Sequence, residues 1–296
     1  MNLRQIEVFR AVMLAGSVTQ AARLLHVSQP GISRMLAHIE LQLGLPLFER
    51  TRNRLRPTPE AEALYAEVEQ VYRGVGRIGD RARELKEGTH LALRVLASPS
   101  TGLEAVPRAL AKLATDFPAA SLHFEVLPAR EMVNQLLHRE CDVAISTLPI
   151  EHPLLDVRSI GQWTLAGVFP AGHALAARRS LRPQDLLREP LVGFSADTPQ
   201  GRAIAAWSEV HGIAPRSHLS VRSGQAACAL AVCGAGVAVV DDLTARAARS
   251  SGLAFRPITG APSFQIAAVT HGGFALSAAA AAFIDLTARA LKALRR

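Results

Sequence analysis

The sequence predicts an α/β protein with an all-α N-terminal part and a long linking helix. Three observations support this fold class. Two short helical patterns flank a tight turn near the N-terminus, an unbroken heptad repeat of apolar residues follows, and short apolar strands then alternate with helices to the end of the chain. Because 296 residues exceed one typical domain, we expect three parts, which cover residues 1–58, 59–88 and 89–296.

The first part is predicted to contain three helices. The helix over residues 3–12 is amphipathic, and its expected buried side consists of Leu3, Ile6, Phe9, Val12 and Met13. A second helix starts at Ser17, which is a good N-cap residue. A third starts at Ser28, carries Pro30 in its first turn, where a missing N–H is not needed, and is followed by Gly44. The last two helices form a helix-turn-helix, a motif that places its second helix in the major groove of DNA.

Small hydroxyl, amide and guanidinium side chains at the start of the third helix suit base edges and phosphates. Beyond this helix, residues 47–50 and 55–58 are predicted strands on either side of a charged turn, which makes a wing. The arginines of the wing are expected to reach the DNA backbone or the minor groove. The residues predicted to contact DNA are Ser17, Thr19, Gln20, Ser28, Gln29, Pro30, Ser33, Arg34, Arg50, Arg52 and Arg54.

The net charge of +8 is concentrated at the N-terminus. Residues 1–58 hold eight arginines and three glutamates, whereas residues 59–87 are net acidic and the remaining positive charge is spread over a much longer stretch. A codon bias that favours arginine over lysine would explain why Arg outnumbers Lys, but it would not explain why the arginines cluster at the N-terminus. A dense positive charge is what binding to the phosphates of double-stranded DNA requires.

From Pro59 to about residue 87 the sequence predicts one long helix. Its apolar positions alternate at spacings of four and three, which is the pattern of a coiled-coil seam. At about 1.5 Å per residue the helix would be about 43 Å long, too long to bury this seam on a small domain, so we expect a dimer. Packing of the stripe on its own chain is the alternative. The seam residues are Leu64, Val68, Val71, Val75, Ile78, Ala82 and Leu85.

The N-terminal part also carries a dense set of motif positions: Ala21-Ala22, Leu24, Ser28-Gln29-Pro30, Ile32-Ser33, Glu40, Leu43-Gly44, Leu47-Phe48, Arg50 and Pro57-Thr58-Pro59. This set resembles the winged helix-turn-helix of LysR-type transcriptional regulators. Gly31 stands where that family usually has Ala, and Glu60-Ala61 replaces a small residue followed by Gly. The resemblance implies a regulator that binds a double-stranded DNA operator, is a homo-oligomer (a dimer, or a tetramer built from two dimers) and is not an enzyme. It leaves contact with RNA polymerase open.

The remaining residues are predicted to form two α/β lobes. Strands are expected at 91–97, 122–127, 142–146, 163–169, 191–194, 217–221, 237–240 and 264–270, and helices at 102–117, 131–139, 200–212, 225–233 and 275–294. This alternation is typical of parallel sheets covered by helices. Lobe I would comprise about 89–161 and 267–296, and lobe II about 162–266. The order resembles the effector-binding domain of the LysR family, which in turn resembles periplasmic binding proteins with a small-molecule effector between their lobes.

Loops after strands and the N-termini of helices would line such a ligand site, and their N–H groups and hydroxyls favour a carboxylate. The candidate effector-binding residues are Ser98, Ser100, Thr101, Ser146 and Thr147 in lobe I, and Ser195, Asp197, Thr198, Ser223 and Asp241 in lobe II. Local roles stay open for several of them. Residues 101–104 fit a capping box, Thr198 fits an N-cap, and either aspartate is also a suitable helix cap.

The segment 236–245 resembles that of family members that sense amino acids and opines. Carboxylate binders on one lobe, with Asp197 or Asp241 for an ammonium or guanidinium group, would suit such a zwitterionic effector. Two other classes of function stay open: an architectural DNA-binding regulator with a degenerate sensor, and a solute-binding protein or enzyme built on the two lobes. The sequence has no G-x-S-x-G elbow, P-loop or kinase signature to support an enzyme.

The cysteine, histidine and apolar patterns argue against a disulfide-rich, metal-binding, secreted or membrane protein. Three cysteines do not make a disulfide framework, and Cys228 and Cys233 are predicted to be buried thiols on different faces of one helix. The ten histidines lack the spacing of metal ligands, so we expect neither a metal nor another cofactor. Arg4 and Glu7 interrupt any signal-peptide pattern, and no apolar stretch is long enough to cross a membrane. These features predict a soluble cytoplasmic protein.

Overall fold

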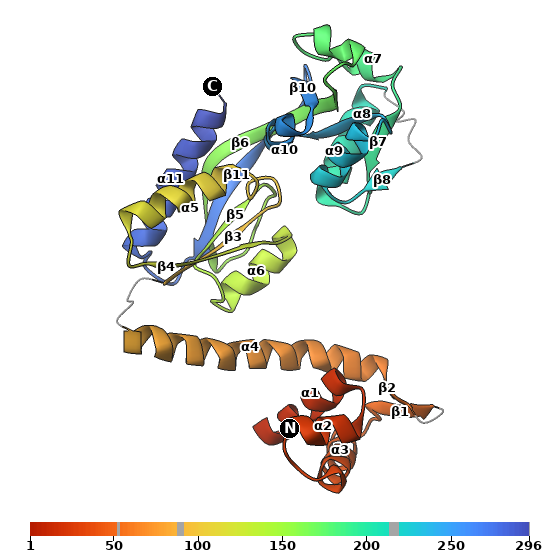
Figure 1. Cartoon of the computed structure of the whole chain (residues 1–296), viewed down its shortest axis with the longest axis vertical. Helices are drawn as coiled ribbons and strands as arrows, with labels where there is room; N and C mark the ends of the chain where they lie inside the picture. The colour runs from red at the N-terminus through yellow and green to blue at the C-terminus, as the bar shows by residue number, and fades with distance from the viewer. Residues whose placement is uncertain (52–53, 88–91, 213–218, 296) are drawn as a thin grey trace. The chain divides into compact units, whose positions relative to one another are not determined.

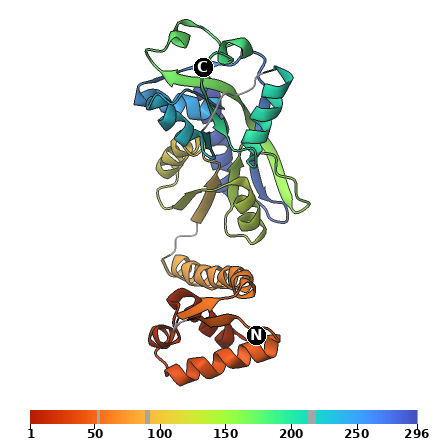
Figure 2. The same ribbon diagram turned by 90° about the vertical axis from the view of Figure 1, so that its right-hand side faces the viewer.

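The computed structural model describes residues 1–51, 54–87, 92–212 and 219–295. The chain divides into two compact units, Met1–Gly88 and Thr89–Arg296. Figures 1 and 2 show the chain from two directions. Within the described ranges, no helix combines the length and the apolar character that a membrane crossing demands.

The first unit consists of three short helices, a two-stranded wing and one long helix: α1 (Leu3–Ala15), α2 (Val18–Leu24), α3 (Gln29–Leu43), β1 (Phe48–Thr51), β2 (Arg54–Pro57) and α4 (Pro59–Glu87) (Figure 1). The predicted caps of α2 and α3 are confirmed. The hydroxyls of Ser17 and Ser28 accept hydrogen bonds from main-chain N–H groups of the first turn, at 3.4 and 3.3 Å. Gly44 ends α3 with φ of 72°, a left-handed conformation that glycine adopts without strain.

The core of the first unit is formed by one face of α1 and the helices that pack on it. Phe9 and Val12 are fully buried, as predicted. Leu3 is 72% exposed, contrary to the prediction. The buried stripe of α1 begins instead at Gln5, whose side-chain amide donates a hydrogen bond to Gln42 Oε1 at 3.1 Å. The first residues of α1 therefore stay outside the core.

Among the described side chains of the long helix α4, the buried apolar ones lie near its N-terminal end. Leu64 and Val68, predicted to lie in an intersubunit seam, pack instead against Phe9 and Leu47 of the same unit. Farther along the helix, apolar side chains of the predicted seam are exposed: Val71 by 42%, Val75 by 53% and Ile78 by 72%, with Ala82 also exposed. Figures 1 and 2 both show α1–α3 on one side of α4, and Figure 1 shows the rest of α4 extending past them. The side chain of Leu85 lies outside the described residues.

The second unit consists of two lobes linked by two long strands (Figure 1). Lobe I contains β3 (Ala92–Ala97), α5 (Ala105–Asp116), β4 (Ser121–Val126), α6 (Ala129–Leu137), β5 (Val143–Ser146) and α11 (Ala278–Leu294). Lobe II contains η1 (Ala174–Ala177), α7 (Pro183–Leu186), β7 (Leu191–Phe194), α8 (Pro199–Val210), β8 (Ser220–Val221), α9 (Gly224–Val232), β9 (Val237–Asp241), α10 (Asp242–Ala247), η2 (Ala248–Ser251) and β10 (Leu253–Pro257). The linking strands are β6 (Leu155–Pro170) and β11 (Ser263–His271).

The strands follow the order β4-β3-β5-β11-β6-β9-β7-β8, and β10 pairs with β6. Up to Thr164, β6 pairs antiparallel with β11. From Leu165 onward it pairs with β9, and from Ala166 also with β10, so one strand belongs to both lobes. Strands β3, β4 and β5 are parallel to one another, and β7 is parallel to β8 and β9. The predicted two-lobed α/β architecture is thus confirmed.

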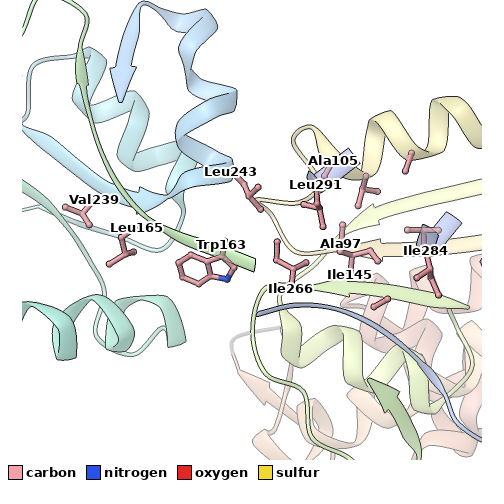
Figure 3. Close-up of a cluster of buried hydrophobic side chains, with 14 of the residues drawn as sticks. Ala97, Ala105, Ile145, Trp163, Leu165, Val239, Leu243, Ile266, Ile284 and Leu291 are labelled. Atoms are coloured by element: carbon pink, nitrogen blue, oxygen red, sulfur yellow. The ribbon is translucent and has the colours of Figure 1, made fainter. Parts of the chain in front are cut away.

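The apolar core of the second unit is continuous across the lobes at Trp163. Figure 3 shows the Trp163 ring between two groups of side chains: Leu165 of β6 and Val239 of lobe II on one side, and Ile266 of β11 and Ile145 of lobe I on the other. All of these side chains are buried. The ring of Trp163 also stacks on Phe264 of β11, with 4.2 Å between the ring centroids. The lobes therefore meet through packed side chains as well as through the linking strands.

Several elements differ from their predicted extent. Strand β6 begins at Leu155 rather than at residue 163, and α10 and β10 were not predicted. Helix α5 begins at Ala105 rather than at residue 102, and the capping box proposed for residues 101–104 does not form. The Glu104 carboxylate instead accepts a hydrogen bond from Arg108, at 2.5 Å. Residues 99–104 consequently form a turn-rich loop between β3 and α5.

Candidate functional site

The start of α3 and the neighbouring α2 present the residues predicted to contact DNA. Thr19, Gln20, Gln29, Pro30 and Arg34 are exposed. The Gln29 side-chain amide donates to the hydroxyl of the half-buried Ser33 at 3.0 Å, so these two groups are held beside each other on consecutive turns. Because Ser17 and Ser28 use their hydroxyls as helix caps, they fix where α2 and α3 begin. The surface offers amide, hydroxyl and guanidinium groups on one helix end.

The wing is attached to α3 by a partly buried network of hydrogen bonds that the sequence analysis did not assign. One carboxylate oxygen of Glu40 accepts hydrogen bonds from Leu47 N at 2.7 Å and Phe48 N at 3.1 Å. The Thr58 hydroxyl, which follows β2, donates to Pro46 O, which precedes β1, at 3.0 Å, so this bond joins the two ends of the wing. These bonds set the wing strands against the helix that precedes them. Of the predicted wing contacts, Arg52 and the side chains of Arg50 and Arg54 lie outside the described residues.

The candidate residues of lobe I gather at the ends of β3 and β5, but most of their hydroxyls serve the main chain. Ser98 Oγ accepts a hydrogen bond from Thr147 N at 3.1 Å, and Thr101 Oγ1 donates to Ser98 O at 3.1 Å. The Ser146 hydroxyl donates to Leu148 O at 2.8 Å. These four side chains are buried. Ser100 is half-buried, and its hydroxyl has no hydrogen-bond partner in the described part of the chain.

In lobe II, Ser195, Asp197 and Thr198 form a compact turn before α8. The Asp197 carboxylate accepts hydrogen bonds from the Ser195 hydroxyl, at 2.5 Å, and from the Arg222 guanidinium, and both hold its pKa below the usual value. Thr198 caps α8, as the sequence allowed. A Cβ on Gly201 would lie 2.1 Å from Ser195 O, so only glycine lets this turn close on the helix. Asp197 and Arg222 remain more than half exposed.

The other two candidates of lobe II are local caps in this structure. Ser223 caps α9, and its hydroxyl also donates to Gln225 Oε1 at 3.1 Å. Asp241 caps α10 and is 2% exposed. Its two carboxylate oxygens accept hydrogen bonds from Thr244 N and the Thr244 hydroxyl, both at 2.8 Å. Asp241 is thus tied to α10, whereas the Asp197–Arg222 pair is accessible to a ligand.

The cysteines do not follow their predicted placement in full. Cys141 and Cys228 are buried, but Cys233, predicted to be buried, is exposed. Cys228 and Cys233 were expected to face different sides of one helix, yet both line a single cavity beside α9. Among the described residues, no group of three or more His, Cys, Asp or Glu side chains is placed to hold a metal ion.

Comparison with known proteins gives the family. A family model for the LysR substrate binding domain matches residues 86–292, and a model for the bacterial regulatory helix-turn-helix protein, lysR family, matches residues 3–62. The chain belongs to the LysR family. It is therefore a LysR-type transcriptional regulator with an N-terminal DNA-binding domain and an effector-binding domain, rather than an enzyme.

Individual LysR relatives match over nearly the whole chain. The HTH-type transcriptional regulator DgcR of Pseudoalteromonas sp is 32% identical over 285 residues, which are 96% of this chain and 98% of DgcR. The octopine catabolism/uptake operon regulatory protein OccR of Rhizobium meliloti is 32% identical over 261 residues, or 88% of this chain and 86% of OccR. The structure of full-length CbnR with its target DNA has a TM-score of 0.77 and 26% identity, covering 98% of this chain and all of CbnR.

Proposed function

We propose that this LysR-type regulator reads an operator in double-stranded DNA through the start of α3 and the wing. The exposed Gln29 and Arg34 at the start of α3 are the observation that carries the proposal. Gln suits the N6 and N7 edge of adenine and Arg suits guanine or a phosphate. The CbnR structure, which contains DNA, is similar to this chain over its whole length and supports the same use of the helix-turn-helix.

Substitution at the start of α3 tests this assignment. Gln29→Ala and Arg34→Ala should each weaken specific DNA binding by at least tenfold, because one lost base contact costs about 1–3 kcal/mol. The measurement is a gel-shift titration with a DNA fragment that the wild-type chain selects from random sequences. Leu41→Ala is the matched control, since Leu41 lies near the other end of α3 and is 81% exposed. Unchanged affinity in both α3 variants would contradict this placement of the recognition helix.

The same regulator is proposed to sense a small metabolite that bears a carboxylate, in the form of an amino acid or an opine. Lobe I offers the half-buried Ser100 in a loop held by Ser98 and Thr101. Lobe II offers a carboxylate and a guanidinium side by side in Asp197 and Arg222. Paired opposite charges suit a zwitterion, which carries both kinds of group. The name of the relative OccR connects that protein with octopine, which has this character.

A thermal-shift experiment on the full chain tests the effector class with octopine, L-arginine and pyruvate. A ligand at 100 times its dissociation constant adds about 2.7 kcal/mol, enough to raise Tm by several degrees. Asp197→Asn should remove the response to octopine and arginine, because it deletes the partner of their cationic groups. Asp285→Asn is the control, since Asp285 also forms an exposed ion pair with an arginine, in lobe I. A rise in Tm with pyruvate alone would show that the effector is a simple carboxylate and not a zwitterion. No rise with any of the three ligands would contradict the proposal.

A further inference from the structure

A cluster of polar and aromatic side chains joins α1 to α4, which lie against each other in the first unit (Figure 1). The Arg10 guanidinium of α1 donates a hydrogen bond to the Glu69 carboxylate of α4, with 2.6 Å between Nε and Oε1. The same guanidinium lies over the ring of Tyr72, 4.3 Å from the ring centroid. We call these three side chains the α1–α4 clamp. None of them is among the residues predicted to contact DNA or to form the seam between subunits.

The ion pair of the α1–α4 clamp is sheltered from water. The side chains of Arg10 and Glu69 are 30% and 27% exposed, so salt screens their attraction less than it screens an open surface pair. The hydrogen bond to Glu69 is the main cause that raises the pKa of Arg10. Burial and a hydrogen bond to Glu69 also raise the pKa of Tyr65, one turn earlier on α4. One carboxylate is thus held by groups from both helices.

The α1–α4 clamp lies at the boundary between the two parts of α4. Val68, next to Glu69, is 3% exposed and packs in the core of the first unit. Val71 and Val75, on either side of Tyr72 in the sequence, are 42% and 53% exposed. Apolar packing is not directional, whereas a planar guanidinium that binds a carboxylate and stacks on a ring favours one orientation of the two helices. The clamp therefore fixes the direction in which the exposed part of α4 leaves the first unit.

The same part of α1 is packed against the helix-turn-helix and the wing. Phe9, next to Arg10, is fully buried. The centroid of its ring lies 6.5 Å from that of Tyr65 on α4 and 6.0 Å from that of Phe48 on β1. Ile39 of α3 is buried in the same apolar cluster. A rotation of α4 against α1 would therefore change the angle between α4 and the helix α3 that is proposed to read DNA.

We propose that Arg10 and Glu69 are positioning residues that set the spacing between the two half-sites bound by a dimer of this chain. The inference rests on the proposed operator reading by α3 and on the dimer expected from the exposed seam of α4. In such a dimer, the direction in which each α4 leaves its first unit places the two copies of α3 on the duplex. One base pair corresponds to about 3.4 Å along the duplex, so a small rotation at the clamp changes which spacer fits. Neither residue needs to touch DNA to act in this way.

Binding to DNA fragments that differ only in their spacer tests the proposal. Two copies of the half-site that the wild-type chain selects are joined by spacers that vary in steps of one base pair. Gel-shift titrations with the full chain give the Kd for each fragment and for a single half-site. The wild-type chain should favour one spacer by about tenfold or more, because any other spacer has to be deformed to fit.

The variant that separates direction from cohesion replaces both charges by apolar side chains. The double substitution Arg10→Met with Glu69→Met leaves no unpaired charge, and such a replacement of an ion pair usually preserves folding. It should reduce the spacer preference to about twofold, while the Kd for a single half-site stays within about twofold of the wild-type value. The Tm reports whether the variant folds. A contact that only stabilises the fold would change binding to all fragments alike and leave the preference as it was.

Exchange of the two charges shows whether the residues act as a pair. Arg10→Glu alone places two carboxylates together and should remove the spacer preference, whereas Arg10→Glu combined with Glu69→Arg should restore it. Arg158→Met is the matched control, because it breaks an exposed ion pair with Asp285 in the second unit, and it should keep the wild-type preference. Loss of the preference without rescue by the exchange would contradict the pairing of the two residues.

The remaining outcomes separate this proposal from the proposed function. A wild-type chain that binds all spacers equally, a chain that sediments as a monomer, or a folded Met variant that keeps the wild-type preference would overturn the positioning role. Gln29→Ala reports on operator reading by itself, through the Kd for a single half-site. If Gln29→Ala weakens that binding while the Met variant keeps its preference, the reading helix stands and the positioning role fails.

Discussion

At the scale of single residues, the two tryptophans of the chain differ in one hydrogen bond. Trp163 Nε1 donates to Thr147 O at 2.9 Å. Trp207 is also buried, but its Nε1 has no partner among the described residues. A buried carbonyl that loses its donor keeps the full cost of having left water, whereas an N–H that is already unpaired has no hydrogen bond to lose.

Trp163→Phe should therefore destabilise the chain more than Trp207→Phe. Both changes remove the same indole ring atoms, so the difference between them combines the hydrogen bond to Thr147 O, which we expect to be about 1–3 kcal/mol, with the stacking of Trp163 on Phe264. Urea unfolding followed by circular dichroism measures the two free energies. Equal losses would show that Thr147 O finds another donor when the indole is gone.

At the scale of secondary-structure elements, α4 has two parts with different roles. Near its start, Val68 is 3% exposed and belongs to the core of the first unit. Farther along, Val75 and Ile78 continue the same heptad pattern but are largely exposed. Exposed apolar side chains repeated at heptad spacing on a long helix are typical of a helix that pairs with a second copy. One sequence pattern therefore stabilises the fold in its first part and, we expect, holds subunits together in its second.

Ile78→Asp and Val68→Ala should separate these two roles. Ile78→Asp is expected to shift the sedimentation mass toward the monomer, because a charge in an apolar seam is unfavourable, and to leave the fold of the first unit intact. Val68→Ala should lower the free energy of unfolding by about 1–3 kcal/mol through lost packing, at unchanged mass. A dimeric Ile78→Asp variant would place the subunit contact elsewhere.

The elements also show where sequence patterns suffice. The ends of α2 and α3 could be predicted, because a capping side chain such as Ser28 acts within one turn. The first part of β6 could not, because its exposed positions include Asp156, Arg158 and Ser159, which do not form an apolar strand pattern. Its strand conformation comes from pairing with β11, more than a hundred positions away in the sequence. Leu3 was assigned to the core because helical periodicity shows which face of α1 is buried. It does not show how far along that face the neighbouring helices reach.

At the scale of the whole molecule, Asp242 joins lobe II to the strand that links the lobes. Its carboxylate accepts a hydrogen bond from Thr164 N of β6 at 3.0 Å and is nearly buried. Burial raises the pKa of Asp242, although that hydrogen bond and the charges of Arg246 and Arg295 act in the opposite direction. A carboxyl group whose pKa is higher in the folded chain favours folding when it is protonated. That contribution is lost as pH rises through the folded-state pKa.

Asp242→Asn should therefore raise the free energy of unfolding near pH 7, since the amide oxygen still accepts from Thr164 N and the buried charge is removed. Below the unfolded-state pKa of about 3.9 the wild-type carboxyl is protonated, and the two proteins should be nearly equal. Urea unfolding at several pH values between these limits measures the gap. A variant that is less stable than wild type at neutral pH would show that attraction to Arg246 and Arg295 outweighs the cost of burial.

The candidate effector site was only partly predictable, because residues far apart in the sequence become hydrogen-bond partners in the whole folded molecule. The positions of Ser98, Ser146 and Asp241 after strands are readable from the alternation of strands and helices. Whether each side chain can bind a ligand depends on whether folding brings a main-chain partner close to it. The Ser98 hydroxyl, for example, accepts a hydrogen bond from Thr147 N, 49 positions away. The partner of Asp197 is likewise Arg222, 25 positions on, which the sequence analysis did not single out. Long-range pairing therefore decides which candidates remain available.

Lobe I is discontinuous along the chain, because β3, β4 and β5 precede lobe II whereas α11, and the linking strand β11 that pairs with β5, follow it. Since β11 lies between β5 and β6, lobe I lacks an interior strand until the last part of the chain has left the ribosome. The first unit is complete long before that point. A premature stop codon shortly before Ser263 is thus expected to yield a chain that still holds the helices proposed to read the operator but has no closed sensor. Such a product would occupy operators without answering to the effector, and its phenotype would be dominant over the full-length gene.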